Sequence, residues 1–310
     1  MARDRIEELL SIKQRAGKYR RVPHYSDLST LRRLWEHNKN AGNGIEELIP
    51  VRIVTLIEVF LRHWIQVLVD HGAPYVERAA KLNANIKYDF AIARSLQGGS
   101  ISLGELIGHS VSLSHLDTAA ATLKTILDQD LFLALATVRD RWEERQRGEA
   151  LAPIIGDIDE HRRVLARIFE VRNIVVHELP ENPPHDAEEV IKFLDVAAEF
   201  LHAADEHFST LIFGDYPLSQ MEMNTEAASR HAAAMDELEG LCRSIEESSD
   251  TKELKDVQRA WLAFKEAEAN RQTEWHHGGT IRPLIYHTTA ARLTTDRIKQ
   301  IKEAEENRMD

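Results

Sequence analysis

The sequence predicts an all-α protein. Apolar residues recur at the three- and four-residue spacing of a helix face in one segment after another, and no alternating strand pattern of any length occurs. Glycine and proline residues separate these segments. The chain has 310 residues, of which 43% are hydrophobic and 29% charged, so it is long enough for two ordinarily folded domains.

The first part of the chain contains one especially regular helical pattern. Pro50 is expected to open a helix over residues 50–71, because apolar residues follow it at i, i+3, i+4 and i+7. A helix predicted over 112–127 begins with serines suited to N-capping. The other helical segments predicted before residue 150 are 3–17, a short piece around 31–35, 75–95 and 129–147, with a loop over 38–44.

A composition change marks the boundary of a second domain. A helix from about residue 159 ends at Pro180, and another is predicted over 186–212. Beyond Gly214 and Pro217 the chain becomes rich in Ala and Glu. Three long helices are expected there, over 218–248, 250–276 and 281–306. The predicted domains are an N-terminal helical extension (1–44), a helical bundle (45–214) and a smaller three-helix domain (216–310).

Charge limits the kind of nucleic-acid contact that the chain can make. The formal net charge is −12, and residues 216–310 hold 13 basic and 18 acidic residues, so acidity is spread over both halves. Proteins that grip long nucleic acids through many phosphates are normally basic. Any RNA contact is therefore expected to be small and local, or to use a patch assembled by folding.

The single cysteine and the absence of long apolar runs indicate the compartment. Cys242 alone excludes an intrachain disulfide and a Cys-based zinc site. The N-terminus leads straight into an amphipathic helix, and no run approaches the ~20 apolar residues of a membrane span. The adjacent His276 and His277 lack the i, i+4 spacing that places two ligands on one helix face. We expect a cytoplasmic protein with no membrane contact, cofactor or metal.

Arg172, Asn173 and His177 interrupt an otherwise apolar strip near the end of the 159–179 helix. A basic side chain beside buried aliphatic residues is hard to solvate and calls for an explanation. One explanation is that Arg172 and Asn173 lie on the wet face while His177 caps the last turn. On an ideal helix positions 172 and 177 diverge by about 140°. An unwound helix end, or a second copy of the chain, would be needed to bring them together.

The spacing Arg-x4-His, with Asn173 directly after the arginine and a Val176-His177-Glu178 ending, resembles the signature of the HEPN superfamily. HEPN domains are α-helical, and many are metal-independent ribonucleases of toxin–antitoxin, abortive-infection and CRISPR systems. The resemblance implies that the 50–71 and 159–179 helices are core members of a four- to five-helix bundle. It also implies that Glu58 is the acidic residue of an early helix that faces the motif. The alternative is that Glu58 is a surface carboxylate paired with Arg62.

These residue types suit RNA cleavage without a metal. The 2′-OH of RNA is the nucleophile, so the protein must supply a proton donor or acceptor and a cation for the charge on phosphorus. His177 can act as base or acid near neutral pH. Arg172 offers a charged fork of donors to the phosphate, and Asn173 can orient either group. HEPN ribonucleases generally pair two motifs across a two-fold interface, which implies a homodimer.

The C-terminal part resembles the N-terminal domain of the LprI lysozyme-inhibitor family. This resemblance implies a three-helix domain. The cysteines usual in that family are missing near Glu226, Ala269 and Thr289. Their loss fits a domain in the reduced cytoplasm, where disulfides are rare. It also puts lysozyme inhibition in doubt. The matching segments, in order, are Gln220–Asn224, Met235–Leu238, Gln258–Glu268, Gly278–Thr280 and Leu293–Arg297.

The aromatic spacing within Gln258–Glu268 has two interpretations. Trp261, Leu262 and Phe264 are expected to be core residues, because such spacing is usual for packing. The alternative is a groove for a peptide, a small molecule or a phage component.

The function predicted from the sequence is an endoribonuclease that acts as a toxin or anti-phage defence effector. Its LprI-like domain would serve in sensing or dimerisation, with an antitoxin or trigger molecule as a possible partner there. Two alternatives remain open. One is a non-catalytic HEPN scaffold or binding module, and the other is an LprI-type inhibitor that binds through residues 216–310.

Overall fold

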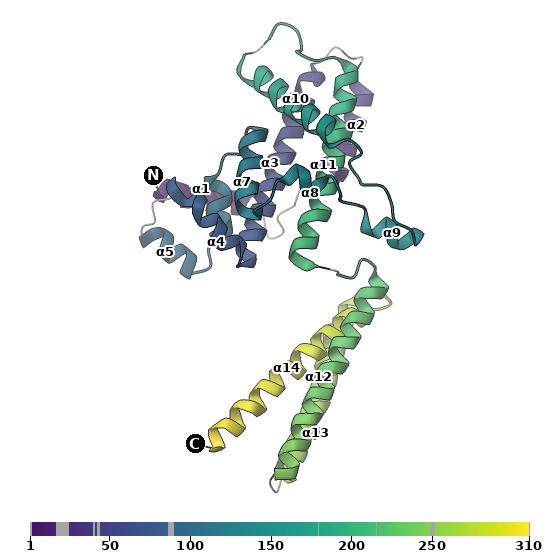
Figure 1. Cartoon of the computed structure of the whole chain (residues 1–310). Coiled ribbons are helices and arrows are strands. Elements are labelled where there is room, and N and C mark those ends of the chain that lie inside the picture. The colour runs from purple at the N-terminus through teal and green to yellow at the C-terminus, as the bar shows by residue number, and fades with distance from the viewer. Residues whose placement is uncertain are drawn as a thin grey trace. The chain divides into compact units, whose positions relative to one another are not determined.

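The computed structural model describes residues 2–16, 25–39, 41, 44–85, 90–178, 180–214, 216–248 and 252–309. Within these ranges the chain forms fourteen α-helices and two short 3₁₀-helices, and no strand occurs there, which confirms the all-α prediction (Figure 1). The chain divides into two compact units, residues 1–214 and 215–310.

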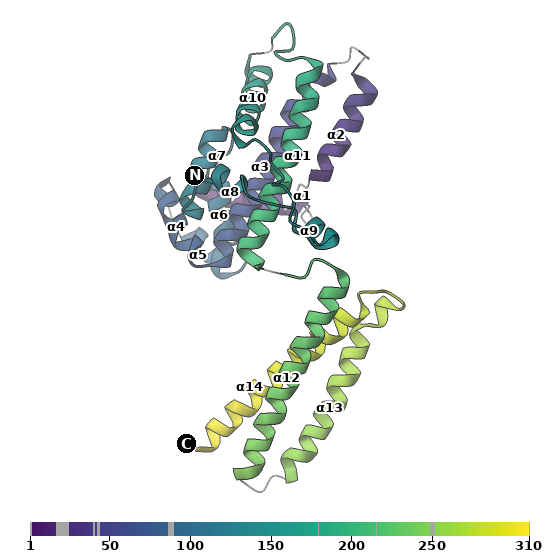
Figure 2. The same ribbon diagram turned by 45° about the vertical axis from the view of Figure 1, so that its right-hand side comes forward.

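The long helix α3 (Ile45–His71) is the centre of the first unit. It packs against α6 (Leu103–Ser110), α10 (Ile158–His177) and α11 (Ala187–Phe213), and Figure 2 shows α3, α10 and α11 side by side. The rings of Phe60 and Trp64 lie 6.5 and 5.4 Å from that of Phe208 on α11. Each such fully buried side chain contributes about 1.5–3 kcal/mol through burial.

Pro50 does not open α3 as predicted but lies inside it, five residues after Ile45. Proline has no N–H, so it cannot donate to the carbonyl of Glu46 one turn earlier. The imidazole of His185, from the segment that precedes α11, lies with Nε2 2.9 Å from this Glu46 oxygen. An Nε2–H donor at this position takes the place of the missing helical hydrogen bond.

The first two helices pack within the first unit. Helix α1 (Ala2–Ala16) contacts α5 (Phe90–Gln97), and α2 (Tyr25–Asn38) packs against α11. Leu28 and Trp35 of α2 are each 2% exposed, and Arg32 forms an ion pair with Asp195 of α11. Helices α1 and α2 therefore each contribute apolar side chains to the bundle core.

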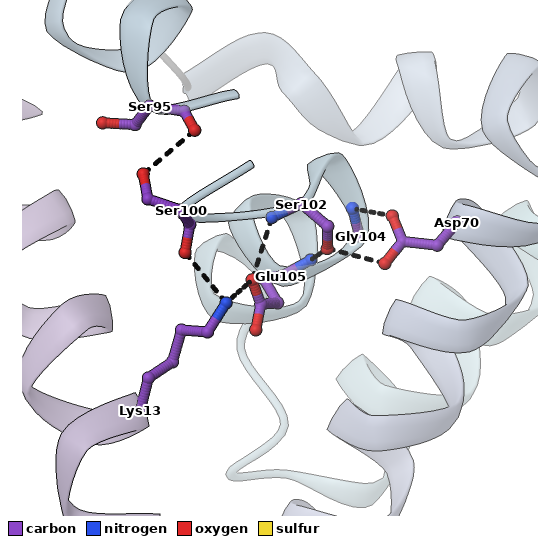
Figure 3. A network of polar contacts seen from close by, with 7 residues as sticks. All are labelled: Lys13, Asp70, Ser95, Ser100, Ser102, Gly104 and Glu105. Carbon is purple, nitrogen blue, oxygen red and sulfur yellow. Dashed lines mark hydrogen bonds and ion pairs between the residues drawn. The ribbon is translucent and has the colours of Figure 1, made fainter. Parts of the chain in front are cut away.

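A polar network fastens α6 to α3 and α1 (Figure 3). The carboxylate of Asp70 accepts hydrogen bonds from the Ser102 hydroxyl at 2.6 Å and from the Gly104 N–H at 2.7 Å. Ser102 and Glu105 form a capping box at the start of α6. Lys13 of α1 then donates to Glu105 and to the Ser100 carbonyl, both at 2.9 Å. This network positions α6, a helix that was not among those predicted from the sequence.

Two predicted helices are broken in the structure. In place of 75–95 the chain forms α4 (Tyr75–Ala79), a 3₁₀-helix (Ala80–Asn85) and α5. In place of 129–147 it forms α8 (Leu131–Leu135) and α9 (Arg141–Arg147). Asp130 and Asp140 each cap one of the latter helices by accepting a backbone N–H, so the segment starts twice.

Helix α7 (Leu116–Leu127) begins after His115, whose side chain makes no capping hydrogen bond. The predicted serine N-cap is therefore wrong. The two serines ahead of it, Ser112 and Ser114, instead contact each other through their hydroxyls at 3.1 Å.

The second unit is a three-helix arrangement, as predicted. It contains α12 (Gln220–Ser248), α13 (Lys252–Gln272), a 3₁₀ turn (Glu274–His276) and α14 (Arg282–Met309), visible in Figure 2. Trp261 is half-buried and packs against its small core, whereas Leu262 and Phe264 are 37% and 54% exposed, so their assignment to the core was wrong. Three long helices around so few apolar residues leave part of α13 uncovered. The core residues are Leu238, Ile245, Ile298 and Ile301.

Among the described residues, no helix combines the length and the apolar character that a membrane crossing requires.

Candidate functional site

Three of the four predicted site residues meet where α10 packs on α3. The guanidinium of Arg172 lies with Nη2 3.7 Å from Oε1 of Glu58, and its Nη1 donates to the Asn173 side-chain oxygen at 2.8 Å. The side chains of Arg172 and Glu58 are 21% and 19% exposed. Arg62, the alternative partner of Glu58, donates to the Gly108 carbonyl at 3.3 Å.

Helix α10 brings Arg172 to this position for local reasons. Asp157 caps its start by accepting the N–H groups of Asp159 and Glu160. Buried residues at helical spacing, including Val171 and Val175, turn one face toward the core. Arg172 follows Val171 directly and therefore lies at the edge of this face, where its aliphatic stem is covered and its charge meets Glu58.

His177 is the last residue of α10 and is exposed. The helix stays regular to its end, since the Glu178 N–H donates to the Ile174 carbonyl at 2.9 Å. An unwound end therefore does not bring His177 to Arg172. In the part of the chain that the structure describes, no hydrogen bond or ion pair involves the His177 imidazole. A second copy of the chain is the remaining way to combine the two.

Pro184 and His185, which lie between α10 and α11, each contact a neighbouring helix. Arg167 of α10 donates to the Pro184 carbonyl at 2.5 Å and forms an ion pair with Glu189 of α11 at 3.2 Å. His185 is held against Glu46 of α3. These contacts join α10 to α11 through Arg167, and the segment before α11 to α3 through His185.

Sequence reasoning missed a second cluster in the first unit. Asp140, His202 and Glu206 place one ligand atom each within 4.8 Å of the others. His202 and Glu206 are four residues apart on α11, which is the spacing of two ligands on one helix face. That spacing was readable in the sequence, but the approach of Asp140, 62 residues earlier, was not.

The second unit contains a cluster around a buried lysine. Lys265 is 7% exposed, and its ammonium lies 3.2 Å from Nε2 of His231. Nδ1 of His231 lies 3.3 Å from Nδ1 of His287. Burial, followed by the nearby charges of Lys265 and His287, lowers the pKa of His231. Burial and a 2.6 Å hydrogen bond to Glu266 raise the pKa of the neighbouring Tyr286 to about 12.

Comparison with known families finds a match for the second unit. Residues 216–301 match the family described as lysozyme inhibitor LprI. This unit is LprI-like. The match covers less than half of the chain, so it describes the second unit only. No curated protein and no solved structure matches the chain. The HEPN resemblance of the first unit rests on the residues themselves, because these comparisons give it no support.

Proposed function

We propose that the chain is a metal-independent endoribonuclease of the HEPN type, acting as a homodimer in the cytoplasm as a toxin or anti-phage defence effector. The observation that carries the proposal is the group of Arg172, Asn173 and Glu58 on facing helices, with His177 exposed five residues after Arg172. The LprI-like unit is proposed to sense a trigger or antitoxin.

The proposed chemistry uses the RNA's own 2′-OH. Its oxygen attacks phosphorus while a base takes the proton, and the bond to the 5′-oxygen breaks as an acid donates a proton to that oxygen. His177 supplies one of these roles and its counterpart in the second copy supplies the other. Arg172 stabilises the charge on phosphorus, and Glu58 and Asn173 hold its guanidinium in place.

Cleavage of total cellular RNA in EDTA tests this proposal. Wild-type protein is expected to leave 2′,3′-cyclic phosphate ends, and His177→Ala and Arg172→Ala are expected to lose at least a hundredfold in rate. The control is His115→Ala, which removes another exposed histidine outside the site and is expected to cut normally. Cleavage by both site variants at the wild-type rate would reject the proposal.

A mixed dimer tests whether the site is composite. One tagged wild-type chain paired with one His177→Ala chain is expected to lose most of its activity, because each active centre would need both imidazoles. Full activity in the isolated mixed dimer would show that a single chain contains the whole site.

The Arg172–Glu58 ion pair favours a second candidate, a non-catalytic binding protein. In that case the guanidinium serves to join α10 to α3, and function lies on the LprI-like unit. Val257, Phe264 and Trp275 are 52%, 54% and 91% exposed there and offer apolar contact area. Calorimetric titration with lysozyme tests this candidate. Binding that weakens in Phe264→Ser, with no RNA cleavage at all, would support it over the ribonuclease.

A further inference from the structure

We propose that Asp140, His202 and Glu206 form a binding site for a divalent transition metal, with Zn²⁺ as the ion that fits best. The three side chains come from the start of α9 and from two adjacent turns of α11, and one ligand atom of each lies within 4.8 Å of the others. This site is separate from the proposed ribonuclease residues and does not depend on their function.

The carboxylates are oriented as metal ligands usually are. Asp140 uses Oδ1 to accept the Glu143 N–H at 2.8 Å, which leaves Oδ2 directed at His202. Glu206 uses Oε2 to accept from Arg141 Nε at 2.8 Å, and its Oε1 has no hydrogen bond within the described ranges. Each carboxylate is thus fixed through one oxygen and offers the other. Hydrogen bonds of this kind hold ligands in place around bound metals.

The ligand types, together with one separation that suits a tetrahedral ion, indicate the kind of metal. Nε2 of His202 and Oδ2 of Asp140 are 3.3 Å apart. Two ligands bound to one tetrahedral ion at about 2.0 Å are separated by about 3.3 Å, whereas octahedral neighbours are closer. One imidazole and two carboxylates suit Zn²⁺, while Ca²⁺ and Mg²⁺ prefer sets made only of oxygen.

Burial and charge also favour a cation. The side chains of Asp140, His202 and Glu206 are 22%, 28% and 16% exposed. The Glu206 carboxylate pairs with the Arg141 guanidinium, which is also bonded to the Gly214 carbonyl at 3.1 Å, while the Asp140 carboxylate lies against the His202 imidazole. The cluster therefore keeps a net negative charge in a partly desolvated position, where a bound cation would offset it.

Three protein ligands leave one tetrahedral position open. A pocket of about 350 Å³ adjoins the cluster and shares Glu206 and Arg141 in its lining, together with Arg139 and His207. Water or a small anion could enter from this pocket and complete the coordination of the metal.

The test is direct metal binding by the full-length protein after treatment with chelator. Co²⁺ is titrated while its visible absorption is recorded, and Zn²⁺ is then added to displace it. Wild type is expected to bind one equivalent with the intense spectrum of a tetrahedral site. Asp140→Asn and His202→Ala are expected to weaken binding by more than tenfold. Asp140→Asn keeps the oxygen that caps α9, so it separates loss of the ligand from loss of folding.

The matched control is the double variant His276→Ala, His277→Ala, which removes an exposed histidine pair from the second unit. It should bind like wild type. Absence of binding in wild type, or equal binding in wild type, Asp140→Asn and His202→Ala, would overturn the proposal. So would loss of binding in the control alone. Since binding is measured without RNA, this result is distinguishable from failure of the ribonuclease proposal.

Discussion

Arg172 of α10 faces Glu58 of α3 at 3.7 Å, a separation longer than that of a tight charge-assisted hydrogen bond. The same guanidinium holds the Asn173 side chain at 2.8 Å. Neither partner is fully buried, since their side chains are 21% and 19% exposed.

Glu58→Gln tests whether this pair serves activity rather than stability. Because the pair is long and partly solvated, the change is expected to cost less than about 1 kcal/mol in the free energy of unfolding. RNA cleavage is expected to fall at least tenfold, since Arg172 loses the carboxylate that positions it. Urea unfolding and cleavage rates are measured on the same preparations. A large loss of stability with unchanged specific activity would assign the pair to structure alone.

Gly104→Ala is expected to destabilise the first unit by about 1–3 kcal/mol through overpacking. A Cβ at position 104 would lie 2.3 Å from the Gln66 carbonyl oxygen and 2.8 Å from Asp70 Cγ, so α6 would have to move away from α3. Hydrogen exchange of α3 and α6 amides reports the effect.

The matched control is Gly240→Ala in α12, where a Cβ meets no atom within 4 Å. Alanine there is expected to stabilise the second unit by up to about 1 kcal/mol through helix propensity. Equal effects of the two substitutions would contradict the close approach of α6 to α3.

His161 should make the first unit sensitive to acid. It is 3% exposed, and burial lowers its pKa to about 4. The unfolded chain therefore takes up a proton near pH 6.5 while the folded chain does not. This contribution to stability is present above pH 6.5 and is lost as the pH falls toward 4, by about 3 kcal/mol at most.

His161→Phe is expected to flatten this dependence, as measured by hydrogen exchange of α10 and α11 amides between pH 7 and 4.5. Glu199 lies 3.4 Å from Nδ1 of His161, and burial raises the pKa of that carboxyl, so Glu199→Gln is measured in parallel. A raised pKa lets the folded state take up this proton before the unfolded chain does, so Glu199 opposes the acid sensitivity and Glu199→Gln is expected to steepen the slope. An unchanged slope in His161→Phe would contradict the assignment to the imidazole.

The sequence was sufficient for elements whose apolar spacing is long and regular. Helices α10 and α11 were predicted close to their observed bounds and α3 close to its observed end, because each repeats one apolar face over many turns. Segments such as 129–147 were not, because Asp140 restarts the helix and local spacing does not reveal which aspartate caps. The imidazole that meets the Glu46 carbonyl one turn before Pro50 comes from His185, 135 residues after the proline, and such a tertiary contact has no local signal.

The residues of the candidate site also differ in whether the sequence alone could predict them. Arg172 and Asn173 were found from the interruption of an apolar strip, and Glu58 only through a family resemblance. On a regular helix His177 lies on a different face from Arg172, and α10 is regular up to its end. The approach of Asp140 to His202 had no local signal, since it depends on how α9 lies against α11.

The cluster in the second unit predicts an unusual histidine tautomer. The Lys265 ammonium can only donate, so Nε2 of His231 must accept at 3.2 Å and carry no proton. The neutral ring then has its proton on Nδ1 and donates to Nδ1 of His287 at 3.3 Å. Nitrogen-15 NMR at pH 8 is expected to show the Nδ1–H form of His231.

Lys265→Met should remove this constraint and raise the pKa of His231, because it removes a nearby positive charge. Since the pKa of His231 is lowered in the folded protein, wild-type stability of this unit should fall below pH 6.5, and less steeply in Lys265→Met. A His231 ring protonated on Nε2 in wild type at pH 8 would contradict the arrangement.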